Sequence, residues 1–390
     1  MKFSSNLKLE WKELERFDKS SDEDRSIVFY VENEYYTIYL KSLIETLVNE
    51  YGLKVSYVTS SKTDPLLKST NKNISSFYIG DGVVRTKFFL NLKAKILIMT
   101  MPDLETFHIK KSKVYPVHYV YLFHSMVSTH LVYRRSAFEH FDSIFCVGNY
   151  QLDEIRSTEK LYDLKPKNLI RYGYGHLDNL LEKYSKRIRL PKNNENKLHI
   201  LLAPSWSDDG LFENFGEKVI DILLREGYKV TFRPHPMTQK KSKKKINRMS
   251  EKFSKNESFL LEQNIFNFDS FLLSDIMITD WSGAALEFAF AFEKPVLFID
   301  VPKKINNPEY EKIPQVPIEV SIREKIGKII LPTDLELIPN EIKMLYGQTK
   351  ELRDKITKIR NELIFNVGES KKDGAEEIIK LLNERESYSG

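Results

Sequence analysis

Short apolar runs alternate along the chain with longer amphipathic stretches. In the N-terminal half, SIVFYV (residues 26–31) and KILIMTMPDL (95–104) predict buried strands, and TIYLKSLIETLVNEYG (37–52) predicts a helix that ends at Gly52. We also predict a helix over residues 128–141 and another that starts at Tyr150. This alternation of helices with nearly continuous apolar strands is typical of a parallel sheet covered on both faces.

The alternation stops once and then resumes. Residues 186–197, KRIRLPKNNENK, lack periodicity and are rich in Lys and Asn, so we interpret them as an interdomain linker. Further strands are predicted at LHILLAP, YKVTFRP, SFLLEQ and DIMITDWS, and PVLFID is the last clear strand. From about Asn340 the sequence predicts two helices separated by FNVGESKKDG.

This pattern predicts an α/β protein with two doubly wound, Rossmann-type domains that face each other across a cleft. The N-terminal, acceptor-side domain is expected over residues 1–190 and the nucleotide-donor domain over 198–340. Residues 341–390 are expected to form C-terminal helices.

Charge and cysteine content narrow the class of protein. The net charge of +5, from 60 basic and 55 acidic residues, is mild for 390 residues, so we expect no nucleic-acid partner. A single cysteine, Cys146, excludes a disulfide framework and a cysteine zinc site. The N-terminus has no apolar signal region, and no apolar run is long enough to cross a bilayer. We therefore expect a cytoplasmic protein, and the basic segment Lys240–Lys245 leaves peripheral membrane contact open.

The familiar catalytic motifs are absent from the sequence. It contains no GxGxxG, no P-loop lysine signature, no HExxH and no GxSxG, which argues against dehydrogenases, NTPases, zincins and α/β-hydrolases. What the second domain offers instead is three polar loops, each of which follows a predicted strand.

The first of these loops is APSWSDDG, which places Ser205, Asp208 and Asp209 where the chain leaves the sheet. Capping of a helix that starts near Leu211 explains these residues equally well. The second loop is FRPHPM, in which two prolines stop the strand and stiffen the chain around His235. Taken alone, that histidine is better explained as a packed loop residue.

The third loop lies in TDWSGAALEFA, residues 279–289. Here the strand ends at Asp280, and Ser282 and Gly283 open a buried helix, where a small residue lets a phosphate approach free backbone N–H groups. An ordinary helix cap is an equal alternative. The three loops follow successive strands and converge on one edge of the sheet, which capping alone does not predict. In the first domain, His124 of LFHSMVSTH follows a strand and is expected to face the cleft if a helix begins at Ser125.

The order of these segments resembles a known family. A histidine loop, GYGHLD, APSW, RPHP and SDIMITDWSGAALEFAFAFEKPVLF follow one another as in the CDP-glycerol glycerophosphotransferases, the teichoic-acid primases and polymerases of GT-B fold. The resemblance covers roughly residues 90–385 and is strongest across 200–300.

The resemblance implies roles for the residues that match the family motifs. His124 matches the catalytic base, although the motif reads HSMVS here in place of the family's HG-type motif. Arg233 and His235 would contact the donor phosphates. The remaining matches bind the phosphate side of the cytidine nucleotide: Asp280, Ser282 and Gly283.

Three further roles are expected around this core. Asp208 and Asp209 would orient the acceptor or serve as an alternative base, and Ser205 would bind the donor. Glu287 would hydrogen-bond the ribose, with a packing role as its alternative. A histidine of ordinary pKa suits the base at neutral pH. The basic phosphate site makes a metal unnecessary, so we expect no metal and no cofactor.

We therefore predict a transferase that moves a polyol phosphate from a CDP-activated donor to a cell-surface polymer or lipid-linked acceptor and releases CMP. A first alternative is a CMP-sugar glycosyltransferase, of Kdo or sialic acid type, in capsule or lipopolysaccharide synthesis. Two others are a UDP-sugar 2-epimerase and a non-catalytic glycan- or lipid-binding module. The HSMVS departure slightly favours the CMP-sugar alternative.

Overall fold

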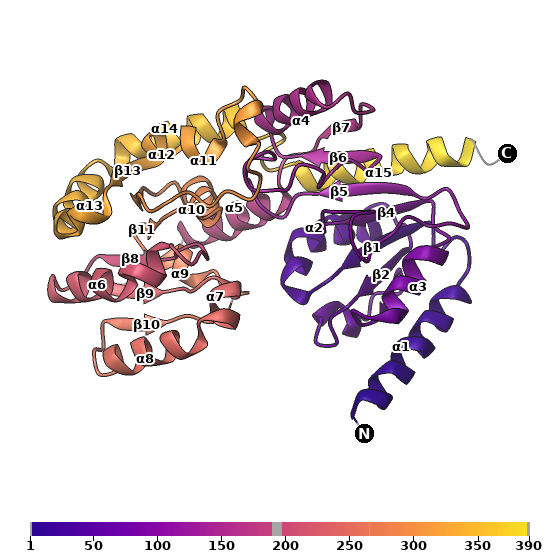
Figure 1. Ribbon diagram of the computed structural model, residues 1–390, viewed down its shortest axis with the longest axis horizontal. Coiled ribbons are helices and arrows are strands. Elements are labelled where there is room, and N and C mark those ends of the chain that lie inside the picture. The colour runs from indigo at the N-terminus through magenta and orange to yellow at the C-terminus, as the bar shows by residue number, and fades with distance from the viewer. Residues whose placement is uncertain (1, 189–196, 265, 388–390) are drawn as a thin grey trace.

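The N-terminal half forms a parallel sheet in the computed structural model, which describes residues 2–188, 197–264 and 266–387 (Figure 1). Within these residues seven strands pair in the order β3-β2-β1-β4-β5-β6-β7. All of them are parallel and most are fully buried, as expected of a sheet with helices on both faces. The strands are β1 (Ile27–Val31), β2 (Val55–Thr59), β3 (Ile74–Tyr78), β4 (Ile96–Met99), β5 (His118–Leu122), β6 (Ser143–Cys146) and β7 (Asn168–Arg171).

Helices from the N-terminal half, together with one from the far end of the chain, cover this sheet. They are α1 (Lys2–Asp18), η1 (Glu34–Tyr36), α2 (Thr37–Asn49), η2 (Pro65–Lys68), α3 (Val83–Asn91), α4 (Asn149–Leu161), α5 (Gly175–Ile188) and α15 (Ser370–Ser387).

The second sheet has six parallel strands within the described residues, in the order β10-β9-β8-β11-β12-β13. These strands are β8 (His199–Leu202), β9 (Lys229–Phe232), β10 (Phe259–Leu261), β11 (Ile276–Thr279), β12 (Val296–Ile299) and β13 (Gly327–Ile330). The helices of this half are α6 (Leu211–Arg225), α7 (Pro236–Lys241), α8 (Lys243–Phe253), α9 (Asp269–Leu273), α10 (Ala284–Phe292), η3 (Tyr310–Lys312), α11 (Ile318–Ser321), α12 (Arg323–Ile326), η4 (Pro332–Leu337), α13 (Ile338–Gly347) and α14 (Thr349–Leu363).

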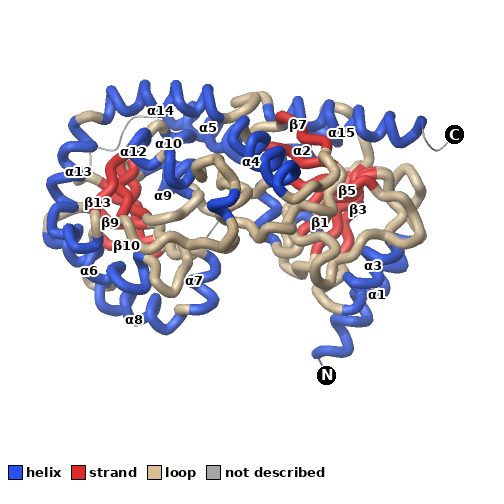
Figure 2. The backbone as a smooth tube through the Cα atoms, turned by 45° about the horizontal axis from the view of Figure 1, so that its top comes forward, coloured by secondary structure: helices blue, strands red, loops and turns tan. Residues whose placement is uncertain are grey.

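The two units lie side by side, and the end of the chain returns from the second unit to the first (Figures 1 and 2). Ala375, Ile378 and Leu381 of α15 are buried in the same core as Leu40 and Leu43 of α2. The returning segment passes so close to the first sheet that a side chain at Gly173, whose φ is +92°, would collide with the Phe365 carbonyl. The apolar face of α2 is therefore completed by residues more than 300 positions away.

The predicted fold class is confirmed, while some elements differ from the sequence interpretation. The predicted helix over 128–141 is wrong, because this segment is a series of turns. Its backbone groups bond to distant elements: Glu319 accepts from Ser128 N–H at 2.8 Å and Glu154 accepts from Thr129 N–H at 2.6 Å. These long-range partners replace the local hydrogen bonds of a helix.

Other differences lie at both ends of the chain, at strand β13 and at the predicted linker. The sequence interpretation missed helix α1 and strand β13, and within the described residues three helices rather than two follow Leu337. The predicted linker begins too early, because α5 continues to Ile188, and its residues 189–196 lie outside the described part of the chain. No helix in the described ranges is long and apolar enough to span a membrane.

Candidate active site

Three polar loops meet at one edge of the second sheet, as the sequence predicted. Strands β9, β8 and β11 are neighbours, so the loops that follow them share the carboxyl edge. Asp280 joins two of these loops: its Oδ1 accepts from Ser205 N–H at 2.7 Å and its Oδ2 accepts from Leu211 N–H at 3.1 Å. Asp280 is only 1% exposed. Because both carboxylate oxygens already bind backbone groups, Asp280 shapes the APSW loop.

The acidic pair of this loop lies apart from that network. Asp208 and Asp209 are exposed, and the helix start predicted at Leu211 is confirmed. The residue at the cap position is Gly210, which offers no side chain. The capping alternative for Asp208 and Asp209 is therefore wrong, because Asp280 binds the Leu211 N–H in their place.

His235 is held by its own helix. Its Nδ1 accepts a hydrogen bond from Met237 N–H at 3.1 Å, which makes the histidine the N-cap of α7. An acceptor Nδ1 has no proton, so the neutral ring carries its proton on Nε2. Burial lowers the pKa of His235 to about 4, and the charges of Lys304 and His124 act in the same direction. His235 is therefore a neutral ring with one fixed N–H donor.

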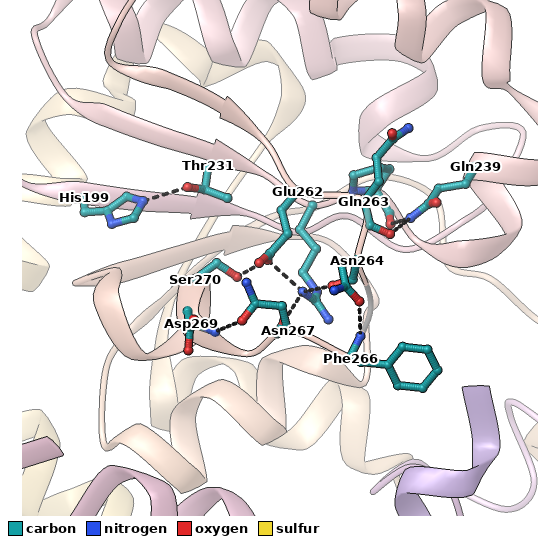
Figure 3. A network of polar contacts seen from close by, with 12 residues as sticks. His199, Thr231, Gln239, Glu262, Gln263, Asn264, Phe266, Asn267, Asp269 and Ser270 are labelled. Carbon is teal, nitrogen blue, oxygen red and sulfur yellow. Dashed lines mark hydrogen bonds and ion pairs between the residues drawn. The ribbon is translucent and has the colours of Figure 1, made fainter. Parts of the chain in front are cut away.

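Arg233, which precedes this histidine in the RPHP motif, is engaged on the other side of the loop. Its guanidinium forms an ion pair with Glu262 at 2.7 Å and bonds the carbonyls of Asn264 and Asn267. Ser270 donates a further bond to Glu262 (Figure 3). The charge of Arg233 is thus paired within the protein, and its hydrogen bonds fix the segment between β10 and α9.

On the first unit, His124 follows β5 and lies in an aromatic surround. Its ring centroid is 4.8 Å from that of Tyr36 and 5.9 Å from that of Tyr39. Burial lowers the pKa of His124 to about 4, against a backbone hydrogen bond with Thr100 that raises it. Nδ1 is buried and has no hydrogen-bond partner among the described residues. The expectation of an ordinary pKa is wrong for this structure, because the ring is desolvated, and no helix of the described chain begins at Ser125.

The two units touch beside His124. A Cβ at Gly283, the N-cap of α10, would collide with Ser125 Oγ, the hydroxyl of the residue after His124. Ser282 Oγ accepts from Ala284 N–H at 3.3 Å. The sequence predicted that the small residue Gly283 lets another group come close to the backbone. A group does come close in this structure, and it is the hydroxyl of Ser125.

The structure adds two residues of GYGHLD that sequence reasoning left without a role. The Tyr174 hydroxyl lies 2.8 Å from Glu287 Oε1 and 3.0 Å from the His124 carbonyl oxygen. His176 is buried, its ring is 5.2 Å from that of Tyr39, and its Nε2 has no partner within the described residues. Burial, with a smaller effect of the Arg233 charge, lowers the pKa of His176 to about 3. The position of GYGHLD in the motif order was the available signal for both residues.

The Tyr174 hydroxyl has one proton but two neighbouring oxygens. Both bonds form together only when Glu287 is protonated, because the carboxyl then donates to the tyrosine oxygen while the tyrosine donates to His124. Burial raises the pKa of Glu287 to about 7, and the Tyr174 hydrogen bond and the Arg233 charge oppose it. Glu287 therefore links α10 to the backbone of His124, which is a different contact from the predicted ribose bond.

We expect Glu287→Gln to remove a pH dependence of stability, since the amide can donate to Tyr174 at every pH. A carboxyl with a raised folded-state pKa binds more protons in the folded state, so its contribution is complete below about pH 4.5 and is lost as pH rises towards about 7. The stability of the variant relative to wild type should therefore increase between pH 5 and pH 8 in urea melts. The exposed Glu257→Gln should leave the pH dependence unchanged. A constant difference between Glu287→Gln and wild type would contradict the assignment.

No group of three or more His, Cys, Asp and Glu within residues 2–188, 197–264 and 266–387 is arranged to hold a metal ion.

Two parallel-sheet α/β units with polar loops between them define the GT-B class of fold. Solved structures agree with this assignment. The wall teichoic acid polymerase TagF with CDPG matches with a TM-score of 0.59 at 14% identity, over 97% of this chain and 95% of that one. A UDP-GlcNAc 2-epimerase from Methanocaldococcus jannaschii matches with a TM-score of 0.55 at 14% identity, over 91% and 99%. At such identities the likeness shows the fold alone.

A family model described as CDP-Glycerol:Poly(glycerophosphate) glycerophosphotransferase matches residues 23–305, so the chain belongs to this family and the predicted resemblance is confirmed. Two relatives come from Bacillus subtilis (strain 168). The minor teichoic acid biosynthesis protein GgaB is 29% identical over 182 residues, 41% of this chain and 19% of that protein. The teichoic acid glycerol-phosphate primase is 28% identical over 156 residues, 39% of this chain and 38% of that protein. The matches thus span well under half of either relative.

Proposed function

We propose that this protein moves a polyol phosphate of the glycerol phosphate type from a CDP-activated donor to a polymer or lipid-linked acceptor and releases CMP. The observation that carries the proposal is the convergence of His124 and His235 from opposite units. His235 follows β9 at the carboxyl edge of the second sheet, and at the same edge Gly283 meets the hydroxyl of Ser125, the residue after His124. Membership of the glycerophosphotransferase family supplies the reaction class.

In the proposed reaction, an acceptor hydroxyl oxygen attacks the phosphorus that carries the polyol. A new P–O bond forms, the P–O bond to CMP breaks, and the hydroxyl proton passes to Nδ1 of His124, the ring nitrogen without a partner. A phosphate anion beside the ring favours the protonated form and so raises the pKa of His124. The Nε2–H of His235 stabilises negative charge on the phosphate.

The other residues of the cleft position the loops or bind the substrates around His124 and His235. Asp280 and Arg233 position the loops, because their side chains are already bonded within the protein. Ser205 and Ser282, with the N–H groups around Gly283, contact the donor once the two units separate enough to admit it. The exposed Asp208 and Asp209 orient the acceptor.

The family match favours CDP-polyol transfer over the alternatives of CMP-sugar transfer and UDP-sugar epimerisation. Cytoplasmic residence, with peripheral contact at the inner face of the membrane through Lys240–Lys245, is part of the same proposal. These lysines would be attracted to an anionic surface.

A donor panel tests the function. The full chain is incubated with CDP-glycerol, CDP-ribitol, CMP-Kdo, CMP-sialic acid or UDP-GlcNAc in the presence of a membrane extract that supplies acceptors. CMP release from a CDP-polyol, with transfer of labelled polyol phosphate to the extract, is the expected result. CMP release only from a CMP-sugar, or conversion of UDP-GlcNAc alone, would overturn the proposal.

A further inference from the structure

Two lysines converge on one tryptophan beside His235. The Nζ of Lys304, in the loop after β12, lies 3.3 Å from the ring centroid of Trp206, and the Nζ of Lys241, in α7, lies 4.4 Å from it. The Trp206 ring is in turn 6.4 Å from the ring of His235. We call Trp206, Lys241 and Lys304 the lysine clamp.

The contacts of the lysine clamp hold two cations in place without neutralising them. An aromatic face attracts an ammonium group through its quadrupole but carries no net charge, so the full positive charge remains. Beyond the contacts with Trp206, neither lysine forms a hydrogen bond or an ion pair with another described residue. Both therefore keep their N–H donors for a ligand.

The positive charges of Lys241 and Lys304 repel each other, and a bound anion would relieve that repulsion. Burial, and to a smaller extent the charge of Lys241, lower the pKa of Lys304 to about 8, while the charge of Asp280 acts in the opposite direction. The carboxylate of Asp280 is already bonded to two backbone N–H groups, so it compensates the charge of Lys304 only in part. Lys304 is partly buried and Lys241 is exposed, and their like charges destabilise each other unless a counter-charge binds between them.

The clamp also differs from the other cation of this loop region. Arg233 has its charge paired with Glu262, whereas the two lysines have theirs unpaired, against the Trp206 ring that lies near the ring of His235. Lys241 and Lys303 are both exposed, but only Lys241 of these two contacts the Trp206 ring in the described structure.

We propose that Lys241 and Lys304, held by Trp206, form the site that binds the diphosphate of the nucleotide donor. That the ligand is a nucleotide rests on the proposed function. That the site binds a diphosphate rests only on the positions of the two lysines beside Trp206 and His235. A diphosphate carries more than one negative charge over two adjacent phosphates, which matches two ammonium groups and one imidazole N–H at one place.

Calorimetric titration of the full chain with CDP, with cytidine and with inorganic pyrophosphate, all at one stated ionic strength, tests the clamp. We expect Lys304→Gln to weaken CDP and pyrophosphate binding about tenfold, as loss of one charged hydrogen bond predicts, and Lys241→Gln/Lys304→Gln to weaken it further. The affinity for cytidine, which has no phosphate, should not change. Lys303→Gln is the matched control, because it removes the same charge from the adjacent residue.

The outcomes separate the clamp from the proposed function. If wild type binds pyrophosphate through the two lysines but neither CDP nor cytidine, the clamp stands and the proposed function fails. If wild type binds CDP and Lys304→Gln binds CDP and pyrophosphate as tightly, the clamp is overturned and the function stands. An equal loss in Lys303→Gln would also overturn it, because the effect would then be general surface charge. Trp206→Leu should weaken pyrophosphate binding while both lysines remain, which a purely long-range charge effect would not produce.

Discussion

Replacing His124 with alanine should lower the rate of CMP release by roughly 10²–10⁴-fold, the usual contribution of a general base, while CDP binds as in wild type. The reason lies in the position of the ring: Nδ1 has no partner within the described structure and is free to accept a proton, and the residue that follows it, Ser125, meets Gly283 of the donor unit. Initial rates at saturating CDP-glycerol and calorimetric titration with CDP measure the two quantities separately.

Two comparisons make this result specific. His108→Ala, at an exposed histidine of the same unit, should leave both turnover and CDP binding unchanged. Unchanged turnover in His124→Ala would remove the base assignment. A parallel loss of CDP affinity would instead show that His124 binds the donor.

At His235, asparagine and alanine should have different effects on stability and the same effect on binding. An asparagine side chain can accept from Met237 N–H and is a favoured N-cap, so His235→Asn should retain the start of α7. It lacks a donor at the position of Nε2, so its affinity for CDP should fall about tenfold or more, as loss of a hydrogen bond to a charged group predicts. His235→Ala should lose the same affinity and also about 1 kcal/mol of stability with the cap.

The pair of variants decides between the two explanations of this histidine. If His235→Asn binds CDP as wild type does, His235 only caps the helix, as its place between two prolines suggested. If it loses CDP affinity while its melting temperature is retained, the ring contacts the donor. Calorimetric titration and thermal unfolding of the same preparations provide both readouts.

The fold was readable from the sequence because parallel strands buried on both faces are nearly continuous apolar runs. Segments such as LHILL and DIMIT have no other stable environment in a chain of this length. Residues 128–141 were misassigned because the N–H groups of Ser128 and Thr129, at the start of the segment, bond to Glu319 and Glu154, which no local pattern reveals. Strand β13 was missed because half of it is Gly and Lys, and as the outermost strand it is less buried.

Sequence reasoning placed the loops of the site correctly but not the side chains within them. Adjacent strands bring RPHP, APSW and DWSG together, and that follows from topology. Topology does not reveal which carboxylates already have hydrogen-bond partners in the protein. Asp280 binds two backbone N–H groups, whereas Glu287 binds Tyr174 of the opposite unit. Lys304 was not considered because a lysine after a strand is ordinary until its distance from Trp206 is known.

The return of α15 to the first unit has a consequence for the order of folding during synthesis. The second unit has its sheet complete once β13 has emerged from the ribosome, whereas α2 must wait for Ala375, Ile378 and Leu381. Contacts of such long sequence separation form slowly, because a large loop must close first. The half of the molecule that is synthesised first is therefore expected to reach its final packing last, with an apolar face of α2 exposed to chaperones in the interval.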